Sequence, residues 1–294
     1  MNDRLCSIII PTCNEGALLH LTVDSILTET DYPLFEIIVV DDGSTDGSCD
    51  RYQHGDRRVR VVRGENLGVA CARNLGAEHA AGSFLVFIDA HCKVSKNWIA
   101  RFVAICSDAS VGLVGPTFTR LDKSEPRGCG VSWSDHTLDS FWFEPADTDQ
   151  PYDVPLTIGA CQAFRTSTFK QLGRYGDEFT KWGSEDLEIC LRAWLLGYRV
   201  VADPTITVAH HFRETRNYDV EDRKILYNFL RMIHMHFSPK RIRKVIRAIS
   251  PNPHLTGAMD DLYQSNVFEV RCRLSSVRTR DDDWFFKVFL PELD

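Results

Sequence analysis

The sequence has 294 residues, of which 44% are hydrophobic and 26% are charged, and its formal net charge is -7. This length and composition are those of an ordinary globular chain with a sizeable core. The acidic balance argues against a nucleic-acid-binding protein, because such proteins usually carry a basic surplus.

The chain begins with polar residues 1–4 and a short apolar run, a pattern that does not make a signal peptide. No stretch approaches the roughly 20 apolar residues of a membrane-spanning helix. The ten cysteines are scattered and none forms a C-x-x-C pair, which argues against a zinc ribbon or a thioredoxin-type site. We therefore expect a reduced, cytoplasmic protein without a transmembrane segment.

Up to residue 118, short apolar runs alternate with amphipathic segments. The runs have the length of buried strands, and the segments between them carry apolar residues at helical spacing. This alternation predicts an α/β fold, with a doubly wound, mostly parallel sheet and helices on both faces. The expected strands are 5–12, 36–42, 59–63, 83–88 and 111–115, and the expected helices lie near 18–27, 68–80 and 98–106.

The chain changes character at residues 119–150, a long excursion that contains several aromatic residues. Long excursions in compact domains are usually functional or mobile, and the aromatic residues could form an acceptor platform or a small cluster under a loop. The elements expected next are a strand within 154–164, a short helix at 166–172, a helix at 183–196, and strands at 198–202 and 208–212.

Beyond residue 220 the sequence predicts helices. Residues 220–249 look like one helix whose basic second half, 240–247, is read as a solvated face. Contact of this half with an acidic partner or a membrane surface is the alternative. Residues 250–294 are expected to pack back as helices, anchored by Trp284, Phe285, Phe286 and Phe289.

The strand expected at 83–88 leads directly to Asp89 and His91. In open α/β sheets ligands bind beyond the carboxyl ends of the strands, and side chains two residues apart share one side of an extended chain. An oxygen and a nitrogen ligand together suit a divalent cation such as Mn²⁺. The alternative is that Asp89 caps a helix and His91 lies on the surface.

Other polar residues follow the expected strands at the same edge of the sheet. No G-x-G-x-x-G follows a strand and no G-x-x-x-x-G-K-[ST] occurs, which disfavours a dinucleotide oxidoreductase and a P-loop NTPase. Carboxylates at a strand end can bind a ribose or a base, and arginines can bind phosphate oxygens. The residues gathered there are Pro11, Thr12, Asp41, Asp42 and Arg63, with Arg73 close by in the sequence.

A third metal ligand is needed, and His210 and His211 directly follow a strand. Only one ring of an adjacent pair can usually turn toward a site. The residues alone leave open which ring does so, or whether both histidines are structural.

The helix expected at 183–196 opens with an acidic turn. Acids in a first turn simply favour the helix macrodipole. However, Glu188 and Arg192 read as an exposed i, i+4 pair, whereas Asp186 continues the buried row of the helix. A carboxylate at that buried end could act as a general base for an incoming hydroxyl, amine or thiol.

Together these segments resemble a GT-A glycosyltransferase of the family-2 type, over roughly residues 5–215. The resemblance is carried by Ser7-Ile8-Ile9-Ile10-Pro11-Thr12-Cys13-Asn14-Glu15, Ile38-Val39-Val40-Asp41-Asp42-Gly43-Ser44-Thr45-Asp46-Gly47, Asn66-Leu67-Gly68-Val69-Ala70-Cys71-Ala72-Arg73-Asn74 and Asp89-Ala90-His91. The last of these stands in the place of the family's Asp-x-Asp.

Three details are similar to the polypeptide N-acetylgalactosaminyltransferases in particular. The first is the Asp-x-His form at Asp89. The second is the segment that begins at Trp182, which resembles Trp-Gly-Gly-Glu-Asn-Leu-Glu, and the third is the segment around His210, which resembles Gly-His-Val-Phe-Arg. The resemblance selects His210 over His211 as third ligand, and it implies a UDP-sugar donor with Mn²⁺ or Mg²⁺.

The resemblance implies an enzyme with three sets of site residues. Asp89, His91 and His210 hold the metal, and Asp186, with Glu185, is the general base of an inverting transfer to a peptide, protein or glycan acceptor. Trp182 covers the donor as part of a closing loop. The residues expected to bind the donor are Pro11, Thr12, Glu15, Asp41, Asp42, Arg63, Arg73, Ala90 and Trp182.

One departure keeps alternatives open, because Asp186 stands where those retaining enzymes have asparagine. The alternatives are a retaining N-acetylgalactosaminyltransferase-like enzyme, a nucleotidyltransferase on a similar fold and a non-catalytic binding module. The expected division is a nucleotide-sugar-binding half at 1–118, an acceptor-binding and catalytic half of the same domain at 119–215, and a C-terminal helical extension at 216–294.

Overall fold

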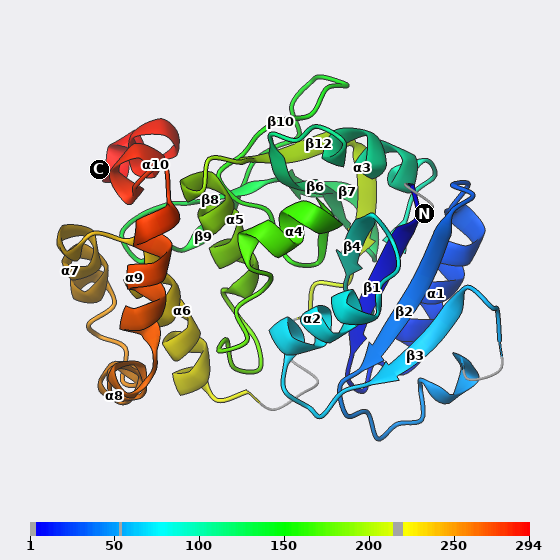
Figure 1. Ribbon diagram of the computed structural model, residues 1–294, viewed down its shortest axis with the longest axis horizontal. Coiled ribbons are helices and arrows are strands. Elements are labelled where there is room, and N and C mark those ends of the chain that lie inside the picture. The colour runs from blue at the N-terminus through cyan, green and yellow to red at the C-terminus, as the bar shows by residue number, and fades with distance from the viewer. Residues whose placement is uncertain (1–3, 53–54, 214–219) are drawn as a thin grey trace.

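The computed structural model describes residues 4–52, 55–213 and 220–294. A central sheet divides the molecule into layers, and the C-terminal helices gather at one end of it (Figure 1). The strands are β1 (Cys6–Thr12), β2 (Phe35–Asp41), β3 (Val59–Arg63), β4 (Phe84–Ile88), β5 (Cys92–Val94), β6 (Val111–Arg120), β7 (Lys123–Cys129), β8 (Val131–Trp133), β9 (Ser140–Trp142), β10 (Tyr152–Asp153), β11 (Cys161–Arg165) and β12 (Arg199–His210).

The helices lie on both faces of this sheet and beyond its end. Those of the sheet region are α1 (Ala17–Glu29), α2 (Val69–His79), α3 (Trp98–Cys106), α4 (Thr166–Leu172) and α5 (Glu185–Leu195). The C-terminal helices are α6 (Asp222–His236), α7 (Pro239–Ala248), α8 (Leu255–Gln264), α9 (Val267–Val277) and α10 (Asp282–Phe289). Among the described residues, no helix is both long and apolar enough to cross a bilayer.

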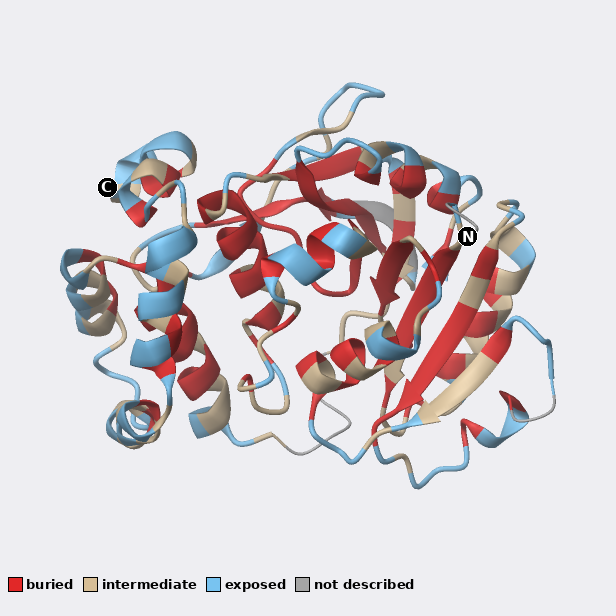
Figure 2. Cartoon of the chain, viewed as in Figure 1, coloured by how far each residue is buried: buried red, intermediate tan, exposed pale blue. Residues whose placement is uncertain are grey.

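The central strands are buried on both sides, as Figure 2 shows. Side chains alternate along a strand, so Ile8 and Ile10 enter one core with α1 and α3, while Ile9 enters the other with α2, α4 and α5. The second core continues without a break into the C-terminal helices, where Phe285 and Phe286 are buried as predicted.

The sheet runs in the order β10-β12-β6-β11-β4-β1-β2-β3. β3, β2, β1 and β4 are parallel, and so are β6 and β12, which confirms the predicted α/β fold. However, β11 pairs antiparallel with both β4 and β6. The inserted strand therefore separates the two parallel sets and makes the sheet mixed at its centre.

Several expected elements differ from the structure. The strands expected at 198–202 and 208–212 are one irregular strand, β12, and the excursion at 119–150 contains β7, β8 and β9. The helix expected at 220–249 is two helices, because the chain turns at Phe237 and Ser238 and Pro239 then starts α7.

The expected division of the chain stays a prediction. Its boundary at 118/119 lies inside β6, so the two halves share one sheet. Its boundary at 215/216 lies outside the described residues.

Candidate active site

The metal-ligand prediction rests on three side chains, and the fold brings them together. His210 ends β12 and lies opposite Cys92 in the antiparallel pairing with β5, and the amide of His211 donates to the carbonyl of His91. This pairing places the rings of His91 and His210 4.7 Å apart. Asp89 reaches both rings, because its Oδ2 lies 3.8 Å from Nε2 of His91 and 3.6 Å from Nε2 of His210.

The donor set fits a divalent cation. One ligand atom from each of Asp89, His91 and His210 lies within 4.8 Å of the others. Both ring nitrogens of His210 are buried without a hydrogen-bond partner among the described residues, an arrangement that is costly unless a ligand completes it. Burial lowers the pKa of His210, which keeps the ring neutral as metal binding requires.

Two charged residues support this cluster from outside. Glu15 lies 3.3 Å from Nδ1 of His91 and forms an ion pair with Arg213. Burial raises the pKa of Glu15, but its contacts with His91 and Arg213 outweigh that effect and hold the pKa below its ordinary value. A carboxylate behind a ligating histidine fixes the ring and raises its basicity.

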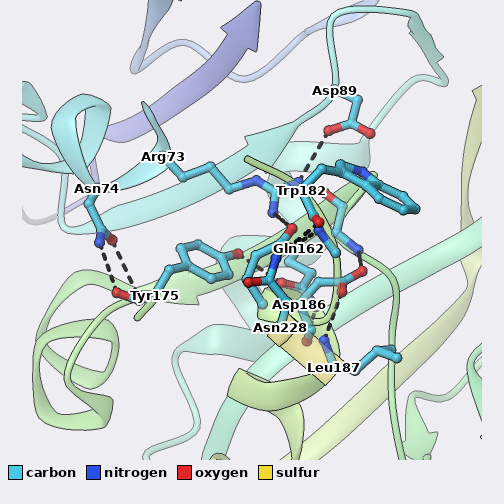
Figure 3. Close-up of polar contacts among 12 residues, drawn as sticks. Arg73, Asn74, Asp89, Gln162, Tyr175, Trp182, Asp186, Leu187 and Asn228 are labelled. Carbon is cyan, nitrogen blue, oxygen red and sulfur yellow. Dashed lines mark hydrogen bonds and ion pairs between the residues drawn. The ribbon is translucent and has the colours of Figure 1, made fainter. Parts of the chain in front are cut away.

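Arg73 connects the metal-ligand cluster to the acidic turn of α5, as Figure 3 shows. Its guanidinium donates to Glu185 at 2.8 Å, to Asp89 at 3.2 Å and to the carbonyl of Gly159 at 2.8 Å. Burial raises the pKa of Asp89, but the contacts with His210, Arg73 and His91 outweigh it and lower the pKa. The carboxylate is therefore ionised and held in place.

The two predicted catalytic acids lie side by side but are held by different partners. Glu185 accepts from Arg73 and from the amide of Gly183, at 2.9 Å. Asp186 accepts from the amides of Gly159, at 2.7 Å, and Leu187, at 2.9 Å. Burial raises the pKa of Asp186, and burial together with Asp186 raises that of Glu185 to about 7. Raised pKa values suit proton transfer near neutral pH.

Gly159 is a site residue that no sequence signal indicated. Its carbonyl accepts from Arg73 and its amide donates to Asp186, so it joins the two halves of the site. A Cβ atom here would lie 2.8 and 2.9 Å from the guanidinium nitrogens of Arg73 and 2.9 Å from Cβ of Asp186. Only glycine leaves room for both neighbours.

The predicted donor-binding residues follow the strand ends as expected, but several already form hydrogen bonds or ion pairs with other residues of the protein. Asp41 is buried, accepts from the amide of Ser44 and pairs with Arg63, which is 55% exposed. Asp42 accepts from the amides of Leu67 and Gly68. These contacts shape the loops around the strand ends, and direct binding of a donor by either carboxylate stays a prediction.

The remaining predicted donor contacts differ in exposure. The hydroxyl of Thr12 is buried without a hydrogen-bond partner among the described residues, whereas Pro11 is half-buried and Ala90 is buried. Trp182 is 40% exposed. The backbone of the preceding residue, Lys181, forms an isolated β-bridge with Gly68, and its carbonyl accepts a hydrogen bond from the amide of Val69 at 2.9 Å. The chain before Trp182 thus contacts the loop at Leu67 and Gly68, whose amides Asp42 binds.

One expectation about α5 is wrong. Glu188 and Arg192 are not an exposed pair but are both buried, and His236 of α6 completes the cluster at 2.7 Å from Glu188. Sequence spacing alone placed them on the outer face, because the C-terminal helices that cover this face are distant in the sequence.

Comparison with known proteins identifies the family. The family model named Glycosyl transferase family 2 matches residues 7–173, and the model of the N-terminal domain of galactosyltransferase matches residues 143–215. The chain belongs to glycosyl transferase family 2. The curated relatives of this family-2 chain include Polypeptide N-acetylgalactosaminyltransferase 11 of Xenopus tropicalis, 32% identical over 260 residues that cover 79% of this chain and 42% of the relative.

A second relative of this family-2 chain is named Inactive polypeptide N-acetylgalactosaminyltransferase-like protein 5, from Macaca fascicularis, and is 30% identical over 78% of this chain and 56% of its own. Among solved structures, GalNAc-T7 with UDP, GalNAc and Mn²⁺ aligns with a TM-score of 0.79 and 23% identity over 97% of this chain and 56% of that chain. S. aureus TarS with UDP-GlcNAc aligns with a TM-score of 0.61 and 17% identity over 93% and 83%.

The comparisons establish the GT-A fold of this family-2 chain. The chain spans about two fifths of the length of the first curated relatives it matches.

Proposed function

We propose that this chain is a metal-dependent glycosyltransferase that moves a sugar from a UDP-sugar to an acceptor. The observation that supports this most is the convergence of Asp89, His91 and His210 beyond the strand ends. Both ring nitrogens of His210 are buried there without a hydrogen-bond partner among the described residues. Arg73 connects this cluster to two carboxylates with raised pKa values, the buried Glu185 and the half-buried Asp186.

In this proposal Asp89, His91 and His210 hold Mn²⁺ or Mg²⁺. A bound divalent cation neutralises the charge that develops on a departing diphosphate. Glu15 keeps the ring of His91 in place, and His210, Arg73 and His91 together keep Asp89 ionised.

The donor is held between the ends of β1, β2 and β3. The buried hydroxyl of Thr12 makes no hydrogen bond among the described residues and can bind a ligand. Glu15, Asp41 and Asp42 shape the uridine side, and Arg63 lies at the phosphate side. The backbone at Pro11 and Ala90 lines the site, and Trp182 covers the sugar.

Asp186 is the general base that takes the proton of the acceptor, and Glu185 tunes it. The carboxylate of Asp186 is fixed by two amides, yet each oxygen keeps a second lone pair for an incoming hydroxyl. Attack opposite the departing UDP inverts the anomeric centre. Retention is the second candidate outcome, which the resemblance to the polypeptide N-acetylgalactosaminyltransferases implies.

The acceptor is a polypeptide or a glycan. The curated relatives are named polypeptide transferases, which favours a peptide hydroxyl. We propose that residues 119–150 and the C-terminal helices border the acceptor.

The test uses the wild-type chain. UDP is titrated with and without Mn²⁺ by calorimetry, and UDP-GalNAc, UDP-GlcNAc and UDP-glucose are then incubated with a peptide and glycan panel and analysed by mass spectrometry. Metal-dependent UDP binding with sugar transfer is expected, and NMR of the product reads its anomeric configuration. Pyrophosphate release from UTP supports a nucleotidyltransferase instead. UDP binding without transfer or donor hydrolysis supports a binding module.

A further inference from the structure

Helix α6 contacts the segment that carries the candidate catalytic acids at two points, one on each side of them. The first contact is made by Asn228 and the second by His236, about two helical turns further along the same side of α6. Both residues lie outside the segments that resemble the family motifs. Both are buried, with at most 2% of their surface exposed.

Asn228 holds the chain just before the acids. Its side-chain oxygen accepts from the amide of Thr180 at 2.9 Å, and its nitrogen donates to the carbonyls of Thr180 and Trp182 at 2.8 and 3.0 Å. Figure 3 shows Asn228 beside this segment. Lys181, Gly183 and Ser184 all have positive φ, so this stretch is bent, and its backbone pairs with the rest of the fold through the isolated bridge between Lys181 and Gly68.

His236 holds the chain just after the acids. Its Nε2 lies 2.7 Å from Glu188 Oε1, the same oxygen that accepts from Nε of Arg192 at 2.9 Å. Arg192 also donates to the carbonyls of Leu172 and Arg174, at 2.7 and 2.8 Å. A fully buried carboxylate with several such partners has little freedom to move, and it lies within one turn of Glu185.

We propose that Asn228 and His236 are positioning residues that fix Glu185 and Asp186 from both ends. This inference rests on the proposed function of those two carboxylates. It makes α6 part of the catalytic apparatus, because α6 is one of the C-terminal helices that contact α5. The geometry of a reacting site tolerates little displacement, so loosening either contact should lower the rate of transfer.

The test compares four single variants of the full chain with the wild type. Asn228→Leu and His236→Leu remove the polar contacts at similar side-chain size, and His236→Gln keeps an N–H that can reach Glu188. His234→Leu is the matched control, because His234 is also buried on α6 but its ring bonds only to the carbonyl of Leu230 among the described residues.

We expect Asn228→Leu and His236→Leu to lower kcat by about tenfold to a hundredfold, with the Kd for UDP–Mn²⁺ unchanged within about twofold. His236→Gln should recover most of the rate, and His234→Leu should keep it. Equal losses in His234→Leu and His236→Leu at matched thermal stability, or an unchanged kcat in both Asn228→Leu and His236→Leu, would overturn the proposal.

Hydrogen exchange separates this inference from the proposed function. Faster exchange of amides 180–188 in Asn228→Leu and His236→Leu, but not in His234→Leu, supports positioning whether or not a donor is turned over. If the wild type turns over no UDP-sugar, the proposed function fails, and positioning is decided by exchange alone. Unchanged exchange in this segment rejects positioning.

Discussion

Nε2 of His210 lies 3.6 Å from Oδ2 of Asp89, although one residue ends β12 and the other follows β4. In the sheet these strands are separated by β11 and β6, so direct pairing does not bring the two side chains together. The short strand β5 does, because it follows Asp89 and His91 in the chain and pairs with the end of β12.

If His210 is a metal ligand, substitutions of the adjacent residues His210 and His211 should differ sharply in their effects on transfer and on UDP–Mn²⁺ binding. His210→Ala should lower metal-dependent transfer by about a hundredfold or more and weaken UDP–Mn²⁺ binding, because a ligand is lost. His211→Ala should leave both within about twofold, since its ring is outside the cluster. Steady-state kinetics and calorimetry measure both quantities, and similar losses in the two variants would contradict the assignment.

The pair of acids predicts how activity depends on pH. Because their pKa values are raised, Glu185 and Asp186 together hold a proton below about pH 7. The pair must lose this proton before Asp186 can act as a base, so kcat should fall as the pH drops from 8 to 6. Glu185→Gln removes the like charge beside Asp186 and should shift the acidic limb to lower pH. A pH profile of kcat for both proteins measures the shift, and a limb that stays in place argues against the coupling.

Gly159→Ala tests the close approach of Arg73 and Asp186. The added Cβ meets both neighbours at under 3.0 Å, so one of them must move. We expect a loss of kcat of about tenfold or more and destabilisation of about 1–3 kcal/mol. Gly257→Ala on α8 serves as control, because the three atoms nearest to its added Cβ all belong to the side chain of Arg223. Kinetics and urea unfolding on both variants decide whether the site responds more than the fold does.

The buried carboxylate of Glu188 should account for part of the stability that the protein loses at low pH. Burial raises its pKa, but Arg192 and His236 outweigh burial and lower it from 4.5 to about 2. A carboxyl group whose pKa is lower in the folded state stabilises the protein above pH 4.5, and this contribution of about 3 kcal/mol disappears as the pH falls toward 2. Between pH 5 and 3, urea unfolding of Glu188→Gln should therefore show a shallower decline than the wild type.

The basic run at 240–247 is not the uniform solvated face expected from sequence. Arg241 is buried, pairs with Asp282, Asp283 and Asp294, and lies over the ring of Phe286. Arg241→Ala leaves the buried Asp282 without this partner and should cost about 3 kcal/mol in urea unfolding. Arg247→Ala, at an exposed position, should change stability by less than about 0.5 kcal/mol. Contact of the exposed part of this run with an anionic surface stays a prediction.

The sequence by itself determined most strands and helices of the first 118 residues, because their periodicities are local and strong, but it did not predict the three-residue strand β5. It also indicated Asp89, His91 and one of the pair His210 and His211 as candidates, since chemistry at a strand end is visible in the order of the residues. The family resemblance then selected His210. The sequence could not show that these side chains meet, because the distance between them depends on the pairing of β5 with β12.

Only the tertiary structure decided the partners of the acidic turn. The i, i+4 spacing of Glu188 and Arg192 fits an exposed or a buried pair equally well, and His236, from a different helix, settles which it is. Gly159 joins Arg73 to Asp186 through its backbone, which no residue pattern reveals. Local sequence fixes which elements form, whereas burial and close approach arise only when distant elements pack together.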